Sequence, residues 1–263
     1  MATQHGAFTL RQACWELVLT AALLLLVVTA VRWLLVADSP AVAAVPDPTL
    51  RLTAVALVVG AVIALVMSPA LQRVTAGHLN PAVTVGLWAL RAFPGRAVLP
   101  FVAAQLVGSA LGTFLGRAVW GPAADAAAVA PGEAWHGAWG GAAVPALEAA
   151  AMAAMTLLAA YAPGVPRLAR ALPLLMGGSV AAAIVGLGPV TGGSVNPARQ
   201  FGPALLSGHT AHLATYLVAP VLGALLAAGA YLISGRRRRR ALPEHCALPE
   251  HRARPELPQA TAG

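Results

Sequence analysis

Long apolar runs alternate with short polar segments over most of this chain. A helix that crosses the hydrocarbon core of a bilayer needs about 20 predominantly apolar residues. Six runs reach this length: Ala13–Val36, Leu50–Ala70, Val98–Trp120, Gly141–Tyr161, Ala171–Pro189 and Ala211–Ser234. The pattern therefore predicts an all-α membrane protein with six transmembrane helices.

Two further apolar stretches, 81–90 and 197–206, are too short to cross a bilayer. Each begins at an Asn-Pro-Ala tripeptide. The first consists of Asn80, Pro81 and Ala82, and the second of Asn196, Pro197 and Ala198. Asparagine is a good helix N-cap, and proline is well tolerated at the first helical position. We therefore expect two re-entrant half-helices, each starting at its Asn-Pro.

The two halves of the chain, about 13–120 and 141–234, repeat one arrangement of three spans and a half-helix. Because three is an odd number, the second copy must be inverted in the membrane relative to the first. The two half-helices then enter from opposite faces and bring their N-termini together near the midplane.

The composition supports a membrane location. Hydrophobic residues make up 59% of the chain, charged residues only 10%, and the mean hydropathy is +0.75, which is too apolar for an ordinary soluble domain. The net charge of +8 is also found in nucleic-acid-binding proteins, but the five consecutive arginines 236–240 directly follow the last apolar run. That placement is typical of a membrane-flanking cluster, so no nucleic-acid partner is expected.

The arginines also predict an orientation. One side of the six-span topology carries the 236–240 block together with Arg11, Arg73, Arg91, Arg96, Arg167 and Arg170. Because cytoplasmic loops are enriched in basic residues, we expect both termini to be cytoplasmic in a plasma or inner cell membrane. The chain then divides into an N-terminal segment (1–12), a membrane domain (13–234) and a basic, proline-rich tail (235–263) that we expect to be disordered.

The paired half-helices predict a pore for uncharged molecules. Each helix N-terminus carries roughly half a positive charge, and the amides of Asn80 and Asn196 are expected to donate hydrogen bonds into one narrow passage. Arg199, three residues after Asn196, adds a full positive charge. Such a barrier opposes cations and protons but admits neutral solutes.

Three other polar residues lie in or beside the apolar sequence. Glu16 and Glu148 occur in the first and fourth spans, and we favour a structural role in which each carboxylate accepts N–H bonds from the backbone before a half-helix. Proton coupling is the alternative. His78, two residues before Asn80, is a candidate pH gate, but we favour a histidine held by backbone hydrogen bonds.

The segments 77–84 (Gly-His-Leu-Asn-Pro-Ala-Val-Thr) and 191–205 (Thr-Gly-Gly-Ser-Val-Asn-Pro-Ala-Arg-Gln-Phe-Gly-Pro-Ala-Leu) closely resemble the two signature loops of the aquaporin family. The resemblance covers about Trp15 to Ser234. It implies a right-handed bundle of six helices plus two half-helices, one pore per subunit and a homotetramer. It also implies a channel rather than an enzyme, with no catalytic residue, no cofactor and no metal.

In that family a four-residue constriction selects the solute. The resemblance assigns Arg199, Gly193 and Ile184 to it, with Gly60 from the second span, or Val59 if the loop carries one extra residue. This ring is wider and less polar than the Phe, His, Cys and Arg of strict water channels. It implies the nodulin-26-like or aquaglyceroporin-type branch, and passage of water, glycerol, urea or undissociated metalloid acids.

Two other functions remain open at this stage. A water-selective aquaporin would have the same architecture. A secondary transporter also has inverted repeats and broken helices, but it would need a coupling site. The spans contain no recognisable nucleophile constellation, and Cys14 and Cys246 alone support neither a disulfide framework nor a thiolate metal site.

Overall fold

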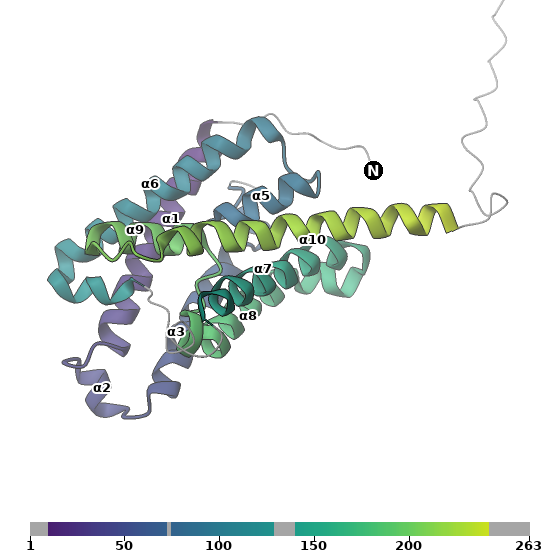
Figure 1. Ribbon diagram of the computed structural model, residues 1–263. Helices are drawn as coiled ribbons and strands as arrows, with labels where there is room; N and C mark the ends of the chain where they lie inside the picture. The colour runs from purple at the N-terminus through teal and green to yellow at the C-terminus, as the bar shows by residue number, and fades with distance from the viewer. Residues whose placement is uncertain (1–9, 73–74, 129–139, 242–263) are drawn as a thin grey trace, which may run out of the picture.

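The computed structural model describes residues 10–72, 75–128 and 140–241. Within these residues it contains six long helices: α1 (Leu10–Leu34), α3 (Pro48–Val66), α6 (Gly95–Trp120), α7 (Ala143–Tyr161), α8 (Pro166–Thr191) and α10 (Leu213–Ala241) (Figure 1). Each includes a segment long and apolar enough to cross a membrane. The predicted six spans are therefore confirmed.

The two half-helices are α5 (Pro81–Ala89) and α9 (Pro197–Ser207). Each begins as the Asn-Pro pair predicts. The side-chain oxygen of Asn80 accepts from the backbone N–H of Ala82 at 2.9 Å, and the oxygen of Asn196 accepts from Ala198 at 2.9 Å. These bonds satisfy one of the free N–H groups at each helix start.

Several helix ends differ from the predicted ones, and prolines explain most of the differences. The second span ends at Val66 rather than Ala70, because Pro69 has no N–H and starts the separate short helix α4 (Pro69–Gln72). The fifth span begins earlier, at Pro166, and retains Pro173 and Pro189 inside the helix, which membrane helices tolerate. The last helix continues through the arginine block to Ala241, so the part of the predicted tail before 242 is helical.

Within the described residues, five short helices connect the long ones: α4, α2 (Pro40–Ala44), η1 (Gly121–Ala127), η3 (Gly140–Ala142) and η4 (Ala162–Gly164). The apolar pattern does not predict α2. It starts at Ser39, whose hydroxyl accepts from the N–H of Ala41 at 3.2 Å. The preceding turn is held by an Arg32–Asp38 ion pair at 2.8 Å.

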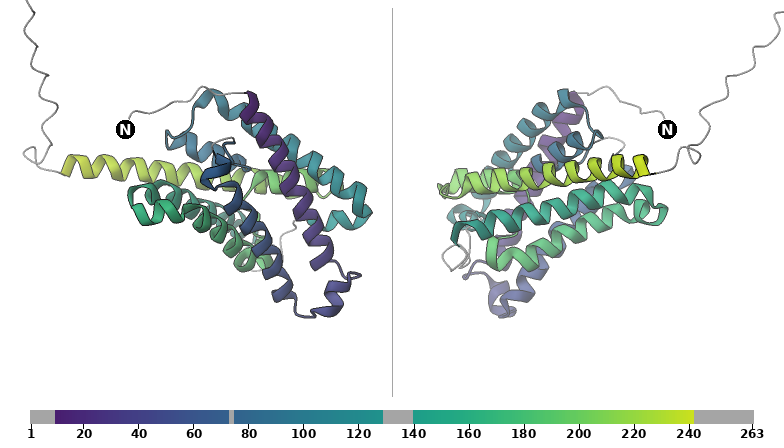
Figure 2. Two further views of the ribbon diagram at one scale, coloured as in Figure 1. Left: turned by 180° about the vertical axis from the view of Figure 1, so that it is seen from behind. Right: turned by 45° about the vertical axis from the view of Figure 1, so that its right-hand side comes forward.

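The contacts between helices follow the internal repeat. α1 packs along α6, the equivalent α7 packs along α10, and α3 packs along its own equivalent, α8. The right-hand view of Figure 2 shows α7, α8 and α10 side by side. Each half-helix contacts the last long helix of the other half, α9 on α6 and α5 on α10. The two repeats are therefore interlocked rather than merely adjacent.

Glycines allow the closest of these contacts. A Cβ on Gly108 of α6 would lie 2.4 Å from the carbonyl oxygen of Leu17 on α1, and a Cβ on Gly223 of α10 would lie 2.0 Å from that of Ala149 on α7. Leu17 follows Glu16, and Ala149 follows Glu148, so these are equivalent places in the two repeats. Small residues that let backbones approach are the usual means of helix association in membranes.

Candidate functional site

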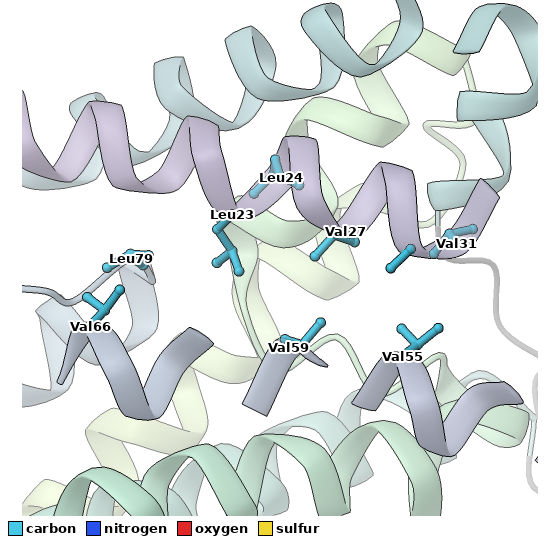
Figure 3. Close-up of a cluster of buried hydrophobic side chains, with 9 residues drawn as sticks. Leu23, Leu24, Val27, Val31, Val55, Val59, Val66 and Leu79 are labelled. Carbon is cyan, nitrogen blue, oxygen red and sulfur yellow. The ribbon is translucent and has the colours of Figure 1, made fainter. Parts of the chain in front are cut away.

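A cavity of about 560 Å³ runs through the bundle, from Leu35 and Ala128 at one end to Gln72 and Pro163 at the other. One wall is aliphatic. Figure 3 shows Leu23, Val27 and Val31 of α1 pointing toward α3, whose Val55 and Val59 point back toward α1. The lining also includes Asn80, Asn196, Ile184, Gly193 and Arg199. The cavity therefore has one apolar wall and a polar side built from the two loops before the half-helices.

The two asparagines hold the loops together. The Nδ2 of Asn80 donates to the carbonyl of Val195 at 3.0 Å, and the Nδ2 of Asn196 donates to the carbonyl of Leu79 at 2.9 Å. An amide nitrogen has two N–H donors, so each asparagine keeps one for a molecule in the cavity. The sequence predicts donors facing the passage but does not predict this reciprocal bonding.

Both loops carry backbone strain at the same place. Leu79 and Val195, each directly before its asparagine, have positive φ angles of 51° and 42°. This conformation is unfavourable for residues with a β-carbon, and most of all for a β-branched one such as valine. Tertiary bonds must therefore hold the loops in place.

The buried carboxylates supply those bonds. Glu16 accepts from the backbone N–H groups of His78 and Leu79, both at 2.9 Å, and Glu148 accepts from those of Ser194 at 3.0 Å and Val195 at 2.6 Å. Both glutamates are fully buried. This is the geometry that the structural interpretation of the two glutamates requires.

Each glutamate also has a side-chain partner, and here the repeats differ. The Nε2 of Gln105 donates to Glu16 at 2.7 Å, whereas the hydroxyl of Thr191 donates to Glu148 at 2.6 Å. Tyr216 then donates to the carbonyl of Thr191 at 2.6 Å. The sequence analysis assigns no role to Gln105 or Tyr216, and it includes Thr191 only as the first residue of the second signature loop.

We expect Glu148→Gln to lower the free energy of unfolding by about 1–3 kcal/mol, because an amide nitrogen facing the N–H groups of Ser194 and Val195 leaves buried donors unpaired. Thermal unfolding in detergent measures this. Solute flux through the folded fraction should remain independent of a pH gradient. A proton-driven uptake in the parent that disappears in the mutant would instead show that Glu148 couples transport to protons.

Arg199 is positioned by a distant loop. Its Nη1 donates to the carbonyl of Ala127 in η1 at 2.8 Å and to the side chain of Gln200 at 3.2 Å. The first bond joins α9 to a loop 72 positions earlier in the chain. The sequence does not indicate Ala127 because any residue provides a backbone carbonyl.

The assignment of Gly60 to the cavity wall is wrong. A Cβ on Gly60 would lie 2.6 Å from the carbonyl oxygen of Gly177, so Gly60 is packed against α8 rather than facing the cavity. The preceding residue, Val59, lines the cavity instead. Counting back from Asn80 fails because the segment between α3 and α5 includes α4 and is not a uniform helix. Val59, Ile184, Gly193 and Arg199 all belong to the lining.

His78 lines the cavity, and its backbone N–H donates to the carboxylate of Glu16. Its Nδ1 lies 3.0 Å from the hydroxyl of Thr84, and its ring packs against Phe93 and Phe101, with ring centroids 4.7 and 5.3 Å away. Side-chain contacts thus hold the ring in addition to the backbone bond of this residue. Among the described residues, no group of three or more His, Cys, Asp or Glu is placed to hold a metal ion.

Six membrane-spanning helices, two opposed half-helices and a lined passage between them define a membrane channel of inverted-repeat architecture. The family model for the major intrinsic proteins matches residues 3–231. The chain belongs to this family, the aquaporin superfamily, whose members are multi-pass membrane channels for water and small solutes and not enzymes.

Several known aquaporins resemble this chain. Aquaporin TIP4-4 of Zea mays is 41% identical over 70% of this chain and 72% of its own length. The probable aquaporin AqpM of Archaeoglobus fulgidus is 37% identical over 61% of this chain and 68% of its own. The aquaglyceroporin structure from Plasmodium falciparum has the same fold, with a TM-score of 0.63 and 20% identity over 84% of this chain and 94% of its own.

Proposed function

We propose that this protein is a passive channel for water and for small uncharged solutes such as glycerol, urea and undissociated metalloid acids, and that it excludes ions and protons. One observation carries the solute assignment. Beside Arg199, the lining residues Val59, Ile184 and Gly193 are aliphatic or lack a side chain. The proposed constriction therefore combines the hydrogen-bonding guanidinium group of Arg199 with an apolar surface.

The chemistry of this ring suits solutes that carry carbon. A glycerol or urea molecule has polar atoms that accept from Arg199 and from the loop N–H groups, and its remaining surface needs an apolar contact. Val59 and Ile184 provide that contact, and Gly193 adds no side-chain bulk. An aromatic side chain and an imidazole at the first two places would instead narrow the ring and favour water alone.

Three positive charges or partial charges line the proposed solute path and oppose cations. α5 and α9 both start at the cavity, so their N-terminal partial charges converge there. Arg199 adds a full charge next to them. A cation must lose water to enter and meets no carboxylate among the described residues of the lining, so its passage along them is opposed.

The remaining parts of the proposal concern topology and assembly. We place the channel domain at residues 13–234, both termini in the cytoplasm and the protein in a plasma or inner membrane, because the basic residues gather on one side of the bundle topology. We also propose a homotetramer with one pore in each subunit, as the aquaporin resemblance implies.

Stopped-flow light scattering on proteoliposomes tests the solute assignment. We expect water, glycerol and urea permeabilities all to exceed those of empty liposomes, with low temperature dependence and no saturation, because a continuous pore binds its solutes weakly. Water flux without glycerol or urea flux would indicate a water-selective aquaporin. Saturating flux, or uptake that follows an ion gradient, would indicate a secondary transporter.

A further inference from the structure

All the methionines of this chain except Met1 gather in one place. The sequence has 5 methionines. Met152, Met155 and Met176 belong to one buried cluster, and Met67 packs against it. Met155 and Met176 line the main cavity, as does Met67. Thioether sulfurs are therefore concentrated between α7, α8 and the end of α3.

Three of these side chains also line a second, smaller cavity. It has a volume of about 20 Å³ and lies between α5, α7 and α8, with Met152, Met155 and Met176 in its wall. A volume of this size holds roughly one water-sized sphere. Met155 and Met176 border both cavities, so the small cavity adjoins the passage.

The spacing of the methionines explains the shared wall. Met152 and Met155 are three residues apart on α7 and so lie on one face of that helix. Met176 reaches the same cavity from α8. The wall of the small cavity thus takes methionines from two helices, and among the described residues no charged side chain lines it.

Thioether sulfur is a soft ligand that selects soft ions such as Cu⁺ over hard ones such as Na⁺. Methionine also serves as a flexible filler of core gaps, and here the three methionines line a cavity of about 20 Å³ together with residues of α5 and α7. A buried cation needs a compensating negative charge. Glu148 lies on α7 four residues before Met152, one helical turn away.

We infer that Met152, Met155 and Met176 form a binding site for a soft monovalent cation such as Ag⁺ or Cu⁺, and that an ion bound there reduces flux through the adjoining passage. The ion draws the Met155 and Met176 side chains into a fixed arrangement and places a positive charge beside the pore. The effect on flux rests on the proposed role of the main cavity as the solute path, whereas ion binding does not.

The chain provides a matched pair of variants for the test. Met152 lines the small cavity but not the passage, and Met67 lines the passage but not the small cavity. Met152→Leu and Met67→Leu make the same chemical change of similar volume. Both are made in a Cys14→Ser/Cys246→Ser background, which removes the only thiols. The probe is Ag⁺ as its nitrate in chloride-free buffer.

Two quantities are measured for each variant: Ag⁺ bound to the purified full-length protein, by calorimetry, and water permeability of proteoliposomes with Ag⁺, relative to the same variant without it. We expect the cysteine-free parent to bind Ag⁺ and to lose water flux. Removing an outer-shell partner already lowers metal affinity about tenfold or more. Met152→Leu, which removes a direct ligand, should therefore raise the Ag⁺ concentration for half-binding and half-inhibition by at least that factor, and Met67→Leu should leave both unchanged.

Each other result overturns a defined part of the inference. A cysteine-free parent that neither binds Ag⁺ nor is inhibited excludes the site. Equal loss of binding in both variants places the ion in the passage instead of the small cavity. Binding that depends on Met152 but does not alter flux keeps the site and removes its effect on transport. If Met152→Leu does not fold, Met176→Leu replaces it, with flux again compared to its own metal-free value.

Discussion

Arg199→Val is expected to leave water permeation in place and to admit protons or small cations. A unit charge at about 4 Å opposes a monovalent cation by about 4 kcal/mol at an effective dielectric constant of 20. The N-terminal ends of α5 and α9 still oppose cations in the mutant. We therefore expect the proton or cation leak to rise about tenfold or more, while part of the barrier remains. Dissipation of an imposed pH gradient in proteoliposomes measures the leak.

Two control variants separate charge from folding. Arg199→Lys keeps the positive charge and should stay close to the parent in ion exclusion. Arg170→Val removes an exposed arginine near the start of α8 that is absent from the cavity lining and should leave the ion leak unchanged. A folded Arg199→Val protein that remains as ion-tight as the parent would show that the two half-helix ends suffice, and would remove Arg199 from the barrier.

The double mutant Val59→Phe/Ile184→His is expected to convert a solute channel into one that favours water. The added aromatic ring and imidazole narrow the cavity where Val59 and Ile184 now line it. Glycerol must pass its carbon backbone, whereas water needs only a small aperture and hydrogen-bond partners. Steric discrimination in apolar pockets commonly reaches about tenfold or more, and we expect glycerol permeability to fall by at least that factor and water permeability by much less.

Val58→Phe is the matched control for this mutant. Val58 precedes Val59 on α3, but it is 38% exposed on the outside of the chain and does not line the cavity. The same enlargement there should leave the ratio of glycerol to water permeability unchanged. If the double mutant also keeps the parent's ratio, Val59 and Ile184 do not form the constriction, and the proposed solute range loses its basis.

The features that depend on local sequence are predicted by the amino-acid sequence alone. Apolar length predicts the six spans because lipid leaves the backbone few alternatives to a helix. The two Asn-Pro pairs predict the half-helices because capping is a property of neighbouring residues. Even here the ends depended on the environment: the second span ends early before Pro69, and α10 continues through the arginine block.

Contacts between residues that are far apart in the sequence are not predicted by local patterns. The sequence places Glu16 and Glu148 in spans but not their partners Gln105 and Thr191, which come from other helices. It favours Gly60, with Val59 as the alternative if the loop is one residue longer, because a count along the chain does not give the direction in which a helical residue faces. Packing of Gly60 on Gly177 decides between them.

By itself, the sequence determined the number of membrane helices and the two half-helix starts, because each follows from residues within one turn or one span of one another. It also determined the inverted repeat, because the order of spans and half-helices can be compared between the two halves of the chain. Only the tertiary structure decided that the asparagines bond to each other's loops, that Ala127 holds Arg199 and that three methionines share one cavity. The physical reason is that a side chain's neighbours across a helix interface depend on rotation and depth. In a uniformly apolar membrane helix, no pattern of polar residues along the chain indicates the rotation of the helix or its depth.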